Sequence, residues 1–141
     1  MTILGMHLYV AVIAGAAAWF VGAVWYGVLG RAWIAALGTT RDALMGPSGR
    51  PDAAPFVFSF VAGCIMALVI GIVTGALTGG HASPAAGMVV ALLLWLGCVF
   101  TTLAVNNAYA KRSTRLTLID GGHWLFAMLA AGAVVGAFPM D

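Results

Sequence analysis

Charge is what this sequence has least of. Only 7% of its 141 residues are charged, whereas 63% are hydrophobic. Because a soluble domain carries about 25% charged residues, a water-soluble globular protein is excluded. The small net charge of +2 also gives no reason to expect a nucleic-acid partner. The composition indicates one integral membrane domain spanning residues 1–141.

Catalytic motifs are also missing. The chain has no GxSxG nucleophile elbow, no GxxxxGK[ST] phosphate loop and no pair of catalytic carboxylates. We therefore expect that the protein is not an enzyme. A membrane-bound enzyme with a quinone or a lipid headgroup near His123 and Trp124 is the less favoured alternative.

Metal-binding motifs are equally absent, since the sequence contains no HxxxH, CxxC or CxxCH. His7 and His81 are expected on one side of the membrane, where they could form a bis-histidine site, and His123 on the other. Asp120 and His123 together supply only two of the usual three or four ligands. We expect no metal and no cofactor.

Disulfide and signal-peptide features are lacking too. Cys64 and Cys98 both lie inside apolar runs, where a thiol behaves as a small hydrophobic group. No Lys or Arg precedes the first apolar run, and that run is longer than the apolar core of a signal peptide. The first run is therefore expected to be retained as a membrane span.

What the sequence does have is four long uncharged runs, at about residues 3–29, 55–78, 84–105 and 116–138. Each is close to or above the ~20 residues with which a helix crosses ~30 Å of hydrocarbon. The runs are continuous rather than alternating, which argues against the strands of a membrane barrel. The sequence therefore predicts an all-α bundle of four transmembrane helices.

The basic residues predict how this bundle is oriented. All of them follow the first or the third run, and they are Arg31, Arg41, Arg50, Lys111, Arg112 and Arg115. Positive charge accumulates on the cytoplasmic side of membrane proteins. Both basic loops are therefore expected to be cytoplasmic, with both termini outside (N-out/C-out).

Short signals mark the first connection. The first helix is expected to continue to Leu37, with Gly38 as its C-terminal cap. A short interfacial helix is expected around residues 42–45, capped by Thr39 or Thr40. The rest of the loop is rich in Gly, Pro and Asp, which favours turns.

Small residues recur every four positions along the second run. They are Ser59, Gly63, Ala67, Gly71, Gly75 and Gly79. Such a stripe lets another helix backbone approach closely inside a membrane. We expect this helix to be a central packing element, with a partner either in the same chain or in a second protomer.

Polar residues gather between positions 106 and 124. Asp120 and His123 are three residues apart on one helix face, and ionisable residues within spans tend to mark functional sites. Together with residues expected near the same depth, they predict a polar ligand pocket at the cytoplasmic face. The candidate ligand-binding residues are Asp120, His123, Asn106, Asn107, Trp25, Tyr26, Arg31 and Trp33.

Structural roles are open for the same residues. Asp120 could cap the fourth helix, where the helix dipole stabilises a carboxylate, or pair with Arg115. His123 could simply bond a neighbouring side chain. The tryptophans and the tyrosine of the first helix could be anchors at the membrane interface.

Two sequence blocks resemble a known family. The pattern WYGxLGRxW at residues 25–33, followed by Asn106 and by LIDGGH at residues 118–123, is similar to the domain-of-unknown-function family numbered 1761. The resemblance implies a small bacterial membrane protein with four spans, and hence a multi-pass protein of the bacterial inner membrane. It implies no particular activity.

Two functions remain open from the sequence. The first is a small oligomeric protein that binds or transports a small solute or an ion. The alternative is a structural or accessory subunit of a larger membrane complex. The expected partners are the lipid bilayer and either further copies of this chain or another membrane protein.

Overall fold

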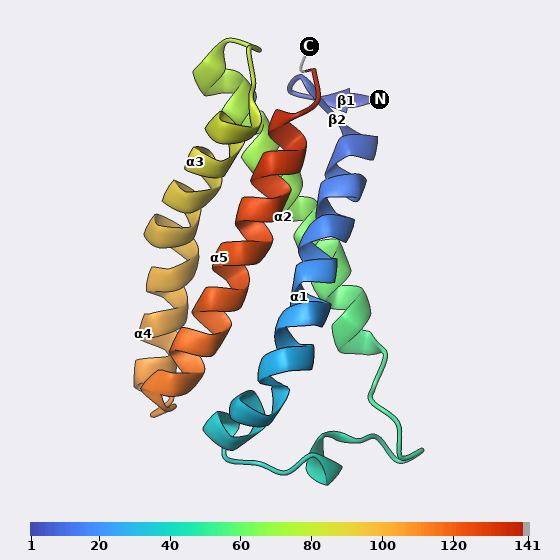
Figure 1. Ribbon diagram of the computed structural model, residues 1–141, viewed down its shortest axis with the longest axis vertical. Helices are drawn as coiled ribbons and strands as arrows, with labels where there is room; N and C mark the ends of the chain where they lie inside the picture. Colours follow the sequence, from blue (N-terminus) through green and yellow to red (C-terminus); the bar gives the residue numbers. More distant parts are fainter. Residues whose placement is uncertain (140–141) are drawn as a thin grey trace.

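The computed structural model describes residues 1–139, which form a short N-terminal hairpin followed by helices joined by non-helical connections (Figure 1). Four helical stretches are long and apolar enough to cross a membrane. They are α1 (Leu8–Leu37), α2 (Ala54–Thr78), a continuous helix of α3 (Pro84–Leu94), η2 (Trp95–Phe100) and α4 (Thr101–Tyr109), and α5 (Thr114–Gly136). The predicted all-α fold with four such helices is therefore confirmed at this level.

The first helix starts later than predicted. Strands β1 (Thr2–Ile3) and β2 (Met6–His7) pair in an antiparallel hairpin, so α1 begins at Leu8 rather than near residue 3. The hairpin is anchored by Met6, whose side chain is only 2% exposed. Its sulfur lies 2.5 Å from the position that a Cβ would take at Gly71 of α2. The hairpin therefore packs on α2 as well as preceding α1.

The first helix ends where the sequence predicts. Gly38 caps α1 in the left-handed conformation, with φ of 74°, and its N–H donates to the carbonyl of Ala35. The short helix in the following connection is the 3₁₀ turn η1 (Asp42–Leu44), where the hydroxyl of Thr40 accepts a bond from Ala43 N.

The helices alternate in direction, so the connections divide between two ends of the bundle (Figure 1). The N-terminal hairpin, the turn at residues 79–83 and the end of α5 lie at one end. The connections at residues 38–53 and 110–113 lie at the other end, where the basic residues are concentrated. We call this the basic end. The orientation of the bundle in a membrane stays a prediction.

The central helix is α5, not α2 as expected. In its most apolar 18-residue window, 44% of the residues are buried, against 22% for α2 and 11% for the third span. The reason is that α5 carries small residues on several of its faces, whereas α2 carries them along one line. Helices α1, α2 and α3 all pack against α5.

Glycine pairs set the closest helix approaches. At the α3–α5 crossing, Gly87 and Gly132 lie backbone to backbone, and a Cβ on either would overlap the carbonyl of the other. At the α1–α2 crossing, a Cβ on Gly15 would lie 2.8 Å from the backbone nitrogen of Cys64. Close contact between backbones is how membrane helices gain packing energy without a hydrophobic driving force.

The small-residue stripe of α2 faces partly into the chain itself. Gly63, Ala67 and Gly71 are buried, and Gly63 packs against Gly15 of α1. Ser59 is exposed, and Gly79 is the left-handed cap of α2, with φ of 59°. The middle of the stripe is therefore occupied by α1 and is not a free surface for a second protomer.

Candidate functional site

Three aromatic side chains converge on one turn of α5. The Nε1–H of Trp25 donates to the carbonyl of Ile119 at 3.1 Å. The hydroxyl of Tyr26 donates to Oδ1 of Asp120 at 2.7 Å. The Nε1–H of Trp95 donates to the carbonyl of Gly121 at 2.8 Å. Residues 119–121 are thus held from α1 on one side and from the third span on the other.

Glycine is needed at positions 121 and 122 because rings occupy the space of their side chains. A Cβ at Gly121 would lie 2.7 Å from Cδ2 of Phe100, and one at Gly122 would lie 2.9 Å from Cζ2 of Trp25. Trp95 and Phe100 begin and end the π-helix η2, whose widened turns frequently occur at functional sites. The LIDGGH block therefore forms a surface of α5 on which aromatic rings of the neighbouring helices pack.

His123 completes this turn of α5. Its ring centroid lies 5.0 Å from that of Tyr26 and 4.9 Å from that of Trp124. The Nδ1 atom is buried and has no hydrogen-bond partner within residues 1–139. Buried polar atoms in proteins are nearly always paired, so one without a partner marks a place where a ligand or water belongs.

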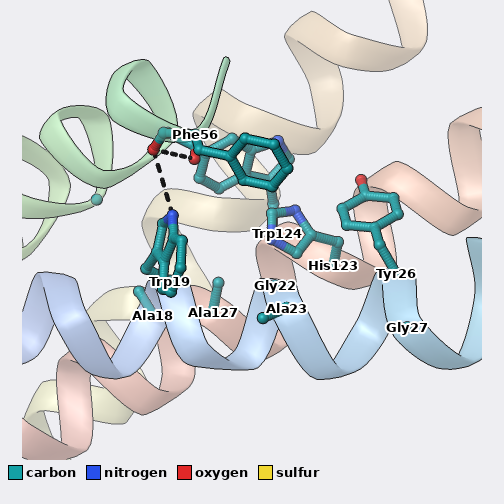
Figure 2. Close-up of a pocket in the computed structure, with 12 residues that line it drawn as sticks. Ala18, Trp19, Gly22, Ala23, Tyr26, Gly27, Phe56, His123, Trp124 and Ala127 are labelled. Carbon is teal, nitrogen blue, oxygen red and sulfur yellow. Dashed lines mark hydrogen bonds between the residues drawn. The ribbon is translucent and has the colours of Figure 1, made fainter. Parts of the chain in front are cut away.

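The imidazole lies on the wall of a cavity of about 380 Å³ between α1, α2 and α5 (Figure 2). We call it the α1–α2–α5 pocket. It is lined by Ala18, Trp19, Gly22, Ala23, Tyr26, Gly27, Phe56, Ser59, Gly63, His123, Trp124 and Ala127. The lining is mostly apolar and aromatic, in contrast to the polar pocket that the sequence predicts.

The pocket opens sideways, between α1 and α2. The α5 residues His123 and Trp124 are half-buried and Ala127 is buried, whereas Ala23 and Gly27 of α1 are exposed. Because α2 contributes its first turns, the pocket lies in the half of the bundle nearest the basic end.

One shared acceptor ties the first turns of α2 to α1. The Nε1–H of Trp19 and the hydroxyl of Ser59 both donate to the carbonyl of Phe56, at 3.2 and 2.9 Å (Figure 2). The Trp19 bond joins the two helices at the mouth of the pocket, whereas the Ser59 bond lies within α2.

Comparison with known proteins places the chain in a family. The model of the family described as "Protein of unknown function (DUF1761)" matches residues 9–136. The chain belongs to this family. No curated protein and no solved structure gives a significant match. Both sequence blocks that carry the resemblance, residues 25–33 and 118–123, lie within the matched region.

The structure of this DUF1761 chain brings together only some of the predicted site residues. Tyr26 and His123 line the pocket, and Asp120 lies directly behind Tyr26. Trp33 packs on the Tyr26 ring, with centroids 5.6 Å apart. Trp25 lies on the other side of α1, where the centroid of its ring is 5.5 Å from that of Phe126.

The remaining predicted residues lie elsewhere. Asn106 and Arg31 are exposed, and neither lines the pocket. Nδ2 of Asn107 donates to the hydroxyl of Thr117 at 3.0 Å, which joins α4 to α5. The pocket also contains four residues outside the predicted ligand-binding set, Trp19, Phe56, Ser59 and Trp124. Of these, the sequence pointed to Trp124 only in the membrane-bound-enzyme alternative, and to Ser59 only as part of the small-residue stripe.

Asp120 is not the cap of α5. Ser113 is the N-cap and accepts a bond from Leu116 N at 3.2 Å, which places Asp120 beyond the first turn. Within residues 1–139, Asp120 forms no ion pair with Arg115 or another basic side chain, and its carboxyl group accepts a hydrogen bond from Tyr26. In the part of the chain that the structure describes, this member of the DUF1761 family thus holds a carboxyl group in a span without a cationic partner.

Proposed function

We propose that this protein binds a small, mostly apolar molecule in the α1–α2–α5 pocket, with His123 as the polar contact. The observation that carries the proposal is the buried Nδ1 of His123, which has no partner in the described chain and belongs to a side chain on the pocket wall. Leaving such an atom unpaired costs about 1–3 kcal/mol. A hydrogen bond from a ligand offsets this cost.

The shape and lining of the pocket support this kind of ligand. A volume of about 380 Å³ is within the usual range of small-molecule sites, which is roughly 300–1,000 Å³. The rings of Trp19, Phe56 and Trp124 provide apolar contact area, and a few polar groups fix the orientation of the bound molecule. The sideways opening supports a ligand that arrives from the hydrocarbon phase of the membrane.

Binding is favoured over solute or ion transport. Asn106 is exposed away from the pocket and Asn107 is engaged with Thr117, so neither extends the polar groups around Asp120 into a path. The lack of catalytic motifs in the sequence likewise favours a binding role over an enzymatic one. We propose that the protein is a multi-pass protein of the bacterial cytoplasmic membrane. Its orientation is N-out/C-out, so the pocket lies in the cytoplasmic half of the membrane.

Filling the pocket tests the proposal. Gly27 lines the pocket, and a Cβ there meets no atom within 4 Å, so Gly27→Leu adds a large side chain to the pocket wall at a position with room for its Cβ. Gly30→Leu is the matched control, because Gly30 has equally open surroundings on the same helix but does not line the pocket.

The measurement is native mass spectrometry of each protein, released gently from its source membrane. We expect a retained small molecule on the wild type and on Gly30→Leu, and none on Gly27→Leu. Retention by Gly27→Leu, or absence of any bound molecule from the wild type, would overturn the proposal. A heteromer of fixed stoichiometry without a small molecule would instead favour the accessory-subunit role.

A further inference from the structure

We propose that the ligand of the α1–α2–α5 pocket is an organic amine in its protonated form, with an apolar body. This inference rests on the proposed function and specifies the ligand of the same site. Three features lead to it: the carboxyl group of Asp120, which lies behind the pocket residue Tyr26 and forms no ion pair in the described residues, an unpartnered nitrogen of the pocket residue His123, and a set of aromatic walls.

The first feature is the carboxyl group of Asp120, which lacks a counter-charge in the described residues. Asp120 lies within a span, accepts a bond from Tyr26, and has no Lys or Arg partner in the described residues. The residues lining the pocket include no Lys or Arg either. Ionisable groups inside membranes are costly and normally face a partner of opposite charge or a bound substrate. A cation beside Tyr26 and His123 supplies that partner.

The nitrogen acceptor points to an N–H donor on this cation. In the tautomer that carries its proton on Nε2, a neutral imidazole accepts a hydrogen bond at Nδ1. Nδ1 of His123 is buried and unpartnered in the described chain, and Asp120 lies three residues earlier on the same helix. A protonated amine both donates to the imidazole and lies in the field of the carboxylate.

The walls suit a cation with an apolar body. Trp19, Tyr26, Phe56 and Trp124 bring four aromatic rings to the pocket. The faces of aromatic rings carry partial negative charge and attract organic cations, most strongly where water is excluded. A neutral apolar molecule of the same shape would gain from the contact area but not from the rings' electrostatics or from Asp120.

A pair of isosteric probes separates charge from shape. N,N-dimethylbenzylamine is protonated at neutral pH, and isobutylbenzene replaces its nitrogen by carbon. Binding of each probe to the protein in lipid nanodiscs is measured by isothermal titration calorimetry, with empty nanodiscs as the blank. The protein is compared with its Asp120→Asn, Gly27→Leu and Gly30→Leu variants.

We expect the amine to bind at least about tenfold more tightly than isobutylbenzene to the wild type and to Gly30→Leu. Asp120→Asn, which keeps the shape and an acceptor for Tyr26, should remove this preference while leaving isobutylbenzene binding unchanged, which shows that the variant is folded. If the two probes bind the wild type with equal affinity and neither binds Gly27→Leu, the amine proposal is overturned, but the proposal of a binding pocket is supported. Amine binding that is the same in Gly27→Leu would overturn both proposals.

Discussion

The hydroxyl of Tyr26 donates a 2.7 Å hydrogen bond to Oδ1 of Asp120 and thereby joins α1 to α5 across 94 positions of the sequence. Each residue comes from one of the two blocks that carry the family resemblance, so the structure explains why the blocks occur together. The first block supplies the rings and the hydroxyl, and the second supplies the carboxyl group and the glycines on which the rings pack.

Removing the Tyr26 hydroxyl should destabilise the bundle. In Tyr26→Phe the Asp120 carboxyl loses its donor, and we expect a loss of about 1 kcal/mol, in line with hydrogen bonds between membrane helices. Reversible unfolding in mixed micelles measures this. Tyr109→Phe is the control and should be neutral, because Tyr109 is 89% exposed.

A double-mutant cycle tests the same bond more strictly. If Tyr26 and Asp120 act as a pair, the losses from Tyr26→Phe and Asp120→Ala, each of which removes the bond, should not add in the double variant. Additive losses would show that the two residues stabilise the bundle independently of each other.

The glycine contact between α3 and α5 predicts a position-specific effect of one methyl group. In Gly87→Ala the new Cβ would overlap the backbone of Gly132, so the helices must separate. We expect a loss of about 1–3 kcal/mol, as for other overpacked sites. Gly97→Ala in the same span should be harmless, since a Cβ there meets nothing within 4 Å. Equal effects of the two substitutions in the unfolding assay would contradict the close approach.

Ser113 is predicted to act at two places at once. Its hydroxyl caps α5 by accepting from Leu116 N and also donates to the carbonyl of Ala36 at the end of α1, at 2.9 Å. Ser113→Ala should therefore cost about 1 kcal/mol or more, the typical value of a helix cap. Thr114→Ala, at the neighbouring exposed position, should change the unfolding free energy little. A neutral Ser113→Ala would show that the cap is replaced by water.

The predicted orientation is tested by labelling from one side. In a background with Cys64 and Cys98 replaced by Ala, Ser48→Cys reports on the basic end and His81→Cys on the opposite end, both at exposed positions. In sealed right-side-out vesicles, a membrane-impermeant maleimide added outside should label His81→Cys. It should label Ser48→Cys only after the vesicles are permeabilised. The reverse pattern would contradict the N-out/C-out prediction.

The sequence predicts the helices well because each span is a local property. Runs of about twenty apolar residues, the left-handed Gly38 and the turn at residues 42–44 all depend on neighbours in the chain. The grouping of both basic connections at one end also follows, because two antiparallel spans separate the first connection from the third.

Other features depend on contacts between distant segments, which one sequence does not reveal. The stripe on α2 is more regular than the small residues of α5, yet α5 is the central helix because its glycines contact α3, α1 and the ring of Phe100. The pocket was only half foreseen for the same reason. Tyr26 and His123 carry polar groups that draw notice in a span, whereas Phe56 and Ser59 belong to the site only because α2 pairs with α1 at that point.

The π-helix η2 makes the length of the third span matter as much as its composition. A π-helix accommodates one more residue per turn than the flanking α-helices, so deletion of a single residue between Trp95 and Phe100 would let the segment revert to regular α geometry. If the six residues kept their number but wound as regular α-helix, the part of the span beyond them would turn by about 100° relative to the part before them. Trp95 and Asn107 lie on opposite sides of that point and each bonds to α5. Loss of the π-helix without loss of a residue would therefore break one of these two contacts, whereas relatives that lack one residue here are expected to keep both.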